Sequence, residues 1–135
     1  MITITVYGMP APQGSKRHVG NGVMIESSRK VKPWRQDVVA AAIACGKMLP
    51  DGPARVSMIF TLPKPKSAPK TRRTYPDRKP DLSKLVRSTE DALTTAATWP
   101  DDARVVECTA AKRYPNEGID ALDRPGAVIR IEAIS

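Results

Sequence analysis

The stretch that decides the fold runs from Lys79 to Glu107 and reads KPDLSKLVRSTEDALTTAATWPDDARVVE. When each residue is placed at about 100° per step, its apolar side chains fall on one stripe of a helix. Such a stripe is typical of the buried face of a helix packed on a sheet. The stripe contains Leu82, Leu85, Val86, Thr89, Leu93 and Ala96. We therefore predict one amphipathic helix at the centre of the chain.

A second stripe follows the flank of this predicted helix. It contains Ser83, Arg87, Glu90 and Thr94. A half-exposed but rigid flank can line a functional site. Pro80 precedes Asp81 at the predicted start of the helix, and a turn over 99–102 is predicted after its end. Asp81 and the pair Asp101 and Asp102 are therefore expected at opposite boundaries of the helix.

Elements before this stretch follow from apolar patterning. Alternation predicts a strand over residues 2–8, and a loop over 9–17 follows it. Residues 20–25 are expected to form a short extended or hairpin segment. A helix is predicted over 32–48, and a strand over 54–62.

The helix predicted over 32–48 has a stripe of its own, and it is expected to end at the turn over 50–53. The stripe consists of Trp34, Val38, Ala41, Cys45 and Met48. We interpret Trp34 as a core residue rather than a platform for a ligand.

Downstream of the central stretch we predict a strand over 103–114, a polar loop over 115–125 and a last strand over 127–134. At 135 residues the chain is long enough for one core and short for two. The expected fold is therefore a single mixed α and β domain (α+β) over residues 1–135, with about four strands in a mixed sheet and two main helices.

Residues 63–80, PKPKSAPKTRRTYPDRKP, form the least regular stretch, which we name the basic loop. Its prolines exclude a helix or a central strand, so an exposed, mobile loop is predicted. A solvated linker is one interpretation, and a phosphate clamp that becomes ordered on DNA is the other, favoured by its place before the acidic residues. The candidate DNA-binding residues are Lys70, Arg72, Arg73, Arg78 and Lys79 of this loop, together with Lys16, Arg17, Lys84 and Lys112.

Composition narrows the classes of partner and cofactor. A formal net charge of +8 favours a polyanion, nucleic acid before membrane. No run of residues is long and apolar enough for a membrane span, and the N-terminus lacks signal-peptide features, so we expect a cytoplasmic protein. Cys45 and Cys108 are expected to be buried free thiols. With His18 as the single histidine no zinc cluster can form, so any metal should be a hard cation held by oxygen.

Three groups of residues carry a resemblance: Lys-Pro-Asp-Leu-x-Lys-Leu-x-Arg from Lys79, Asp-Ala-Leu from Asp91, and Asp-Asp-Ala-x-Val-Val-Glu from Asp101, with Lys-Arg-Tyr later. This pattern resembles the RusA family of Holliday junction resolvases, phage and bacterial endonucleases that cut four-way DNA junctions. The match is specific over about 79–114, and the opening Val-Tyr-Gly-Met-Pro-x-Pro-Gln-Gly from Val6 is looser. The resemblance implies a homodimer that uses Mg²⁺ or Mn²⁺.

The resemblance also implies roles for single residues. Asp81 and Asp102 correspond to catalytic carboxylates that bind the divalent metal, with Asp101 beside them. Arg87 stands where the family has a basic residue, usually lysine, that cleavage requires. Ser83 stands where the family usually has a further aspartate, so this chain departs from the pattern of metal ligands.

Glu90 offers a hypothesis for the missing carboxylate. It lies seven residues after Ser83, within about 20° on the helix, although the rise is about 10 Å. In that case the carboxylate has moved along the flank from position 83 to position 90. The alternatives are that Glu90 is an ordinary surface glutamate, or that Ser83 disables cleavage. Asp91 is expected to be solvated or to form an ion pair. Asp81 could also simply cap the helix.

The sequence thus predicts a metal-dependent, structure-selective DNA endonuclease that resolves four-way junctions by paired symmetric nicks in DNA recombination and repair. Two further interpretations stay open. One is a catalytically impaired junction-binding or architectural protein of the same fold. The other is a general nucleic-acid-binding domain, which only charge and the basic loop support.

Overall fold

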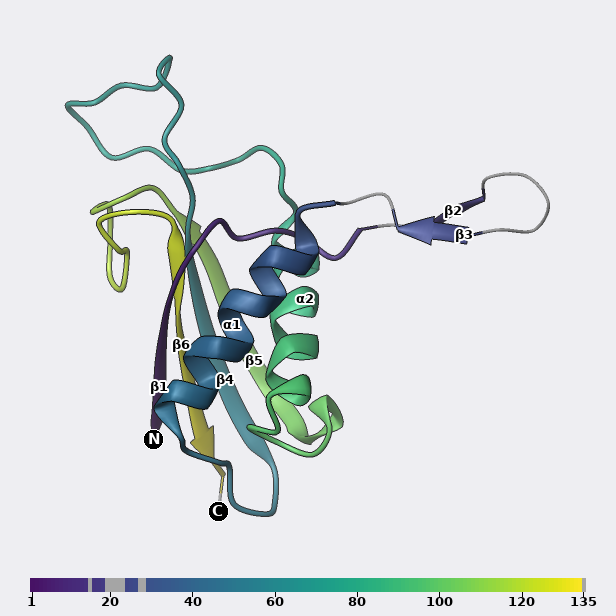
Figure 1. The fold of residues 1–135 in the computed structure, drawn as a ribbon. Helices are drawn as coiled ribbons and strands as arrows, with labels where there is room; N and C mark the ends of the chain where they lie inside the picture. The colour runs from purple at the N-terminus through teal and green to yellow at the C-terminus, as the bar shows by residue number, and fades with distance from the viewer. Residues whose placement is uncertain (15, 19–23, 27–28, 135) are drawn as a thin grey trace.

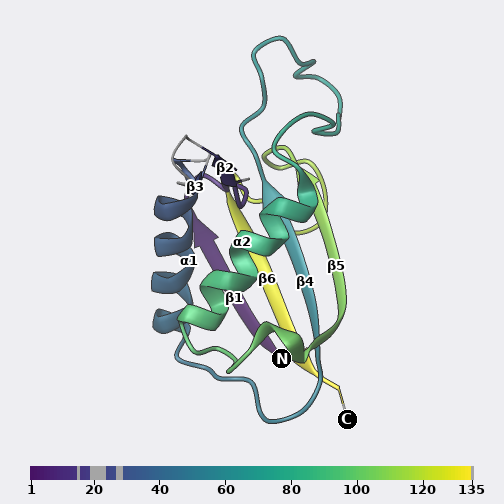
Figure 2. The same cartoon turned by 90° about the vertical axis from the view of Figure 1, so that its right-hand side faces the viewer.

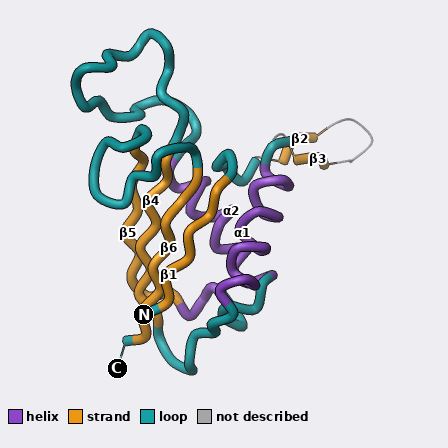
Figure 3. Tube along the Cα trace, turned by 60° about the vertical axis from the view of Figure 1, so that its left-hand side comes forward, coloured by secondary structure: helices purple, strands orange, loops and turns teal. Residues whose placement is uncertain are grey.

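The computed structural model describes residues 1–14, 16–18, 24–26 and 29–134, and its main body is a four-stranded sheet with two helices on one face (Figures 1 and 3). The sheet contains, in spatial order, β1 (Ile2–Tyr7), β6 (Gly126–Ala133), β4 (Ala54–Thr61) and β5 (Val105–Arg113). The helices are α1 (Val31–Cys45) and α2 (Leu82–Thr95). The smaller elements are β2 (Lys16–His18), β3 (Met24–Glu26) and the 3-10 turn η1 (Asp102–Arg104). The predicted α+β domain is confirmed.

The sheet is mixed. β6 pairs antiparallel with both β1 and β4, whereas β4 and β5 are parallel neighbours. A parallel pair needs a crossover connection, and α2 supplies it by running back along the sheet between the end of β4 and the start of β5 (Figure 2). The two ends of α2 therefore lie at opposite ends of these strands, and β5 forms an edge of the sheet.

The core lies between the sheet and the helices. Alternate residues of β4, namely Val56, Met58 and Phe60, are fully buried, as strand geometry requires for one covered face. From the helices, Trp34 is fully buried, and its indole Nε1 donates a hydrogen bond of 3.1 Å to Thr89 Oγ1 of α2. This bond joins the two helices inside the core, and it confirms Trp34 as a core residue.

The predicted end of the first helix is wrong. α1 ends at Cys45 because Gly46 takes a left-handed conformation (φ 69°) and its N–H bonds to the carbonyl of Ala42. Beyond this cap the helical stripe no longer applies. Met48 is consequently 69% exposed, and Leu49 is buried instead.

Two smaller predictions also differ from the structure. Cys108 is exposed rather than buried because it lies on the edge strand β5, and Cys45 is only partly buried; both are free thiols. Residues 16–18 form β2, where a loop was expected. The segment predicted over 20–25 lies outside the described residues except for its last two positions, and the side chains of Lys16 and Arg17 are also outside the description.

Candidate active site

Asp81 occupies the N-cap position of α2, with extended backbone angles of φ −68° and ψ 133°. Its side chain makes no capping hydrogen bond, so capping does not account for this aspartate. The carboxylate is exposed, and Lys84 Nζ lies 3.9 Å from its Oδ2. An aspartate held at a fixed position but open to solvent can still accept a ligand.

A pocket of about 620 Å³ opens beside Asp81. Residues 9–14, the basic loop and the first turn of α2 form its walls, and prolines supply much of the apolar lining. Its charged lining consists of Asp81 with Lys30, Arg78, Lys79 and Lys84. We name it the basic pocket, since four cations surround a single carboxylate in it.

Three hydrogen bonds, donated from α2 and from β5, fix the walls of the basic pocket. Ser88 Oγ donates to the carbonyl of Ala11 at 2.7 Å, which ties residues 9–14 to α2. From β5, Lys112 Nζ donates to the carbonyls of Arg78 at 2.8 Å and Pro80 at 3.0 Å. Lys112, a candidate for DNA contact, thus also holds the chain just before Asp81.

The second half of α2 faces carboxylates instead. Burial raises the pKa of the Glu90 carboxyl, and the negative charges of Asp102 and Asp91 raise it further. Burial is also the largest cause of the raised pKa of Asp102, followed by its hydrogen bond with Asp101 and the charges of Asp101 and Asp91. Glu90, Asp91, Asp101 and Asp102 therefore act on one another electrostatically, and we name them the acidic cluster.

η1 brings the acidic cluster together. Asp101 is the N-cap of η1, and its Oδ1 accepts a hydrogen bond of 2.9 Å from the backbone N–H of Ala103. Asp101 therefore helps to build the turn that was predicted over 99–102. Asp102 follows as the first residue of η1, and its negative charge raises the pKa of Glu90 on the flank of α2.

The structure brings Glu90 and Asp102 together but leaves Asp81 apart. Nine residues separate Asp81 from Glu90, a rise of about 13 Å along the helix axis. A magnesium ion holds its ligands at about 2 Å, and this rise keeps the backbones of Asp81 and Glu90 well beyond that range. The shared metal site of Asp81 and Asp102 stays a prediction.

The carboxylates near α2 are the candidate ligands for the divalent metal that the family resemblance implies. Within the described ranges, no three His, Cys, Asp or Glu side chains are grouped so as to hold a metal ion. Magnesium needs less than a full protein cage, because one or two carboxylates with water and substrate phosphate suffice. Mutual repulsion in the acidic cluster is the kind of strain that a hard cation relieves. Asp102 and Glu90 carry oxygen donors of the type that such an ion takes, and their role as its ligands stays a prediction.

The rest of the flank lies between these two regions. Ser83 and Arg87 are both exposed on α2, and Arg87 comes one turn before Glu90. The predicted second stripe therefore places a cation next to the acidic cluster. Asp91, which we expected to be solvated or paired, is partly buried and contributes to this cluster. In the sequence, only its position next to Glu90 could have indicated that Asp91 belongs to the acidic cluster, since helical periodicity alone does not show where η1 lies.

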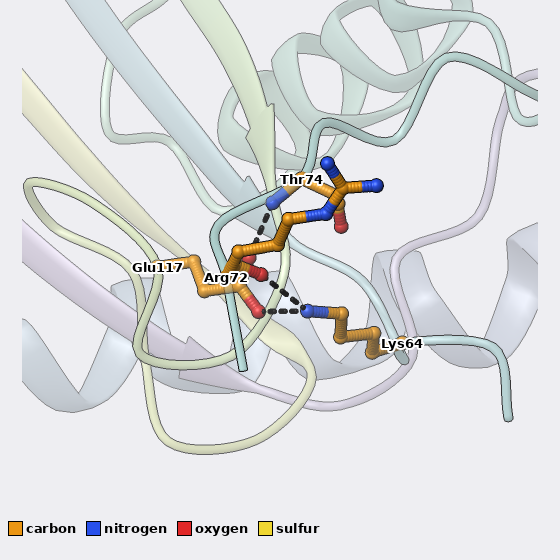
Figure 4. Close-up of polar contacts among 4 residues, drawn as sticks. All are labelled: Lys64, Arg72, Thr74 and Glu117. Atoms are coloured by element: carbon orange, nitrogen blue, oxygen red, sulfur yellow. Dashed lines mark hydrogen bonds and ion pairs between the residues drawn. The ribbon is translucent and has the colours of Figure 1, made fainter. Parts of the chain in front are cut away.

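The basic loop, 63–80, contains no helix or strand, as predicted. Lys70, Arg72 and Arg73 are exposed on it. The guanidinium carbon of Arg73 lies 4.7 Å from the ring centre of Tyr75. The loop is also fastened to the segment between β5 and β6, through a contact that sequence patterning did not indicate (Figure 4).

Comparison with known families agrees with this arrangement. The model of the family described as endodeoxyribonuclease RusA matches residues 7–132 of this basic chain, which places it in a class of enzymes that act on DNA phosphodiesters. Because the match covers nearly the whole chain, the chain belongs to the RusA endodeoxyribonuclease family. The resemblance found in the sequence is confirmed. Membership implies endodeoxyribonuclease activity in the resolution of Holliday junctions.

A search of curated proteins gave no match. In the part of the chain that the structure describes, no helix has the length and apolar character needed to cross a bilayer.

Proposed function

We propose that this chain is a divalent-metal-dependent nuclease that resolves four-way DNA junctions by paired symmetric nicks, in DNA recombination and repair. One observation carries the proposal beyond family membership: the negative charge of Asp102 in η1 raises the pKa of the Glu90 carboxyl on α2, and the charges of Asp101 and Asp91 raise the pKa of Asp102. Carboxylates that repel one another inside a chain of net charge +8 are expected where a cation binds.

Within this proposal the residues have separate tasks. Asp102 and Glu90 hold the metal, with Asp101 keeping η1 in place through its capping bond. A bound Mg²⁺ or Mn²⁺ supplies an activated water and neutralises charge on the phosphate. Arg87, one turn away, donates to the phosphate oxygens with its planar guanidinium. The cations of the basic pocket orient the strand through its phosphates.

Two symmetric nicks require two sites, so we propose a homodimer with one site in each subunit. A second copy also offers a way to bring Asp81 to the acidic cluster, since one chain keeps the two about 13 Å apart along α2. Asp81 would then act on the metal of the other subunit.

The test is nicking of a labelled four-way junction and of a matched linear duplex, each with magnesium, manganese or chelator. The wild-type chain is compared with Asp102→Asn. Symmetric, metal-dependent cuts in the junction that the substitution abolishes would support the proposal. Cuts that persist in chelator, or in the variant, would contradict it.

A second candidate function is junction binding without cleavage. The exposed Ser83, in place of the family's usual aspartate, favours it because the N-terminal end of α2 then offers only Asp81 as a carboxylate. Tight junction binding without cuts under any metal would identify this function. Ser83→Asp would then be expected to restore nicking.

A further inference from the structure

Glu117, in the segment between β5 and β6, uses both oxygens of its carboxylate on the basic loop. Its Oε2 accepts a hydrogen bond of 2.6 Å from Lys64 Nζ, and its Oε1 accepts one of 2.8 Å from the backbone N–H of Thr74 (Figure 4). The side chains of Lys64 and Glu117 are only 15% and 17% exposed. An ion pair shielded to this degree is screened less than a surface pair.

The same ammonium group closes the loop on itself. Lys64 Nζ also donates to the carbonyl of Arg72 at 3.2 Å, and it lies 5.8 Å from the ring centre of Tyr114. Lys64 stands at the start of the basic loop, whereas Arg72 and Thr74 stand beyond its middle. Residues 64–74 are therefore drawn into one closed turn around the Glu117 carboxylate.

Arginine side chains packed against the next residue, Gly118, show how closely the two segments approach. Gly118 has φ +126°, and a Cβ there would lie 2.7 Å from the guanidinium of Arg73 and 2.9 Å from Nε of Arg113. Only glycine fits comfortably in this position. The hydrogen bond from Lys64 is the largest cause of the lowered pKa of Glu117, and the N–H of Thr74 is the next.

We propose that Glu117 is a positioning residue for DNA binding, which holds residues 64–74 as a preformed phosphate-binding surface. The inference rests on the proposed function, because it takes junction DNA as the ligand. The cations presented by this turn are exposed; they are Lys66, Lys70, Arg72 and Arg73. Glu117 itself touches no phosphate. Because Glu117 already orders the proline-rich loop in the free protein, DNA binding costs less conformational entropy, and the loop does not have to fold on DNA.

The sign of the effect separates this role from simple electrostatics. Removing a negative charge near phosphates should tighten DNA binding if charge alone matters. Under our proposal Glu117→Gln weakens junction binding instead, by about five- to tenfold, because the released loop must be ordered again. The slope of affinity against salt concentration should stay the same, since the number of phosphate contacts is unchanged.

The experiment measures junction affinity over a range of salt by fluorescence anisotropy, in the Asp102→Asn background so that cleavage does not interfere. Asp123→Asn is the matched control, because Asp123 is exposed on the same segment and makes no ion pair in the described part of the chain. The control should bind as well as the parent or slightly better. Equal or tighter binding by Glu117→Gln would overturn the proposal.

Limited trypsin digestion without DNA gives a second readout that is independent of the proposed function. Cleavage after Lys70, Arg72 or Arg73 should be several-fold faster in Glu117→Gln than in Asp123→Asn, with the thermal midpoint reported for each. Lys64→Gln tests the same contact from the other side should Glu117→Gln fail to fold. Unchanged digestion of the loop in a folded variant would show that Glu117 does not anchor it, even if the chain proves to be a resolvase.

Discussion

The two ends of α2 differ in charge and in how they are assembled. At the N-terminal end, the cations of the basic pocket surround Asp81, and the walls of the pocket, with Lys30 and residues 9–14, come from segments far apart in the sequence. Near the other end, Glu90 and Asp91 of the helix meet Asp101 and Asp102, which follow it by a few residues. One helix thus separates a region suited to phosphate from a region suited to a divalent metal. The comparison teaches that local sequence can build the acidic cluster, whereas the basic pocket needs the whole fold.

The largest expected effect is at the acidic cluster. Asp102→Asn should lower junction nicking by about 100-fold or more, because it removes a charged metal ligand. Junction affinity should stay within about twofold, since the basic pocket is untouched. Single-turnover nicking and anisotropy measured on the same preparation check this. A parallel loss of binding and cleavage would break the distinction between the two ends.

Glu90→Gln tests whether the carboxylate has moved along the flank of α2. We expect nicking to fall by about 10- to 100-fold, the range for a group that supports a metal site. The magnesium concentration needed for half-maximal rate should rise as well. Asp123→Asn serves as the control for loss of one negative charge. Rates equal to wild type would remove Glu90 from the site.

Thr89→Val tests the part of α2 that both ends share. Valine keeps the shape but leaves the buried indole N–H of Trp34 without its acceptor, so the free energy of unfolding should fall by about 1–3 kcal/mol. Urea denaturation measures this. Nicking per folded molecule should not change, because the side chain faces the core rather than either site. A selective loss of activity without a loss of stability would contradict this expectation.

The smallest effect is expected at the basic pocket. Arg78→Ala should reduce the slope of log affinity against log salt by about 1, with a few-fold loss of junction affinity at low salt. The maximal nicking rate at saturating protein should be unchanged. Filter binding at several salt concentrations measures the slope. An unchanged slope would mean that the Arg78 side chain does not contact phosphate.

Sequence patterning predicted those parts of the fold that depend on periodicity. The stripe of α2 was correct, with Leu85, Thr89 and Leu93 fully buried. Patterning failed at α1 because a single left-handed glycine, Gly46, ended the helix before the apolar pattern did. It also failed for Cys108, since strand alternation does not reveal which strand will lie at an edge.

The candidate site was predicted in part for the same reason. Helical geometry placed Glu90 on the flank and Asp81 at the helix boundary, and both positions were confirmed. It could not show that Asp102 turns back towards Glu90 rather than towards Asp81. The bond between Lys64 and Glu117 joins residues 53 positions apart, and no periodic signal marks it.

The position of β5 at the edge of the sheet bears on the solubility of the isolated chain. An edge strand leaves backbone groups open to pairing with another molecule, which is a common start of aggregation. Val106 is 60% exposed on this strand, so the edge is not fully protected by polar residues. Glu107 next to it is held at the surface by an ion pair with Arg55 of β4. That charge discourages strand addition, and replacing Glu107 with an apolar residue would favour aggregation.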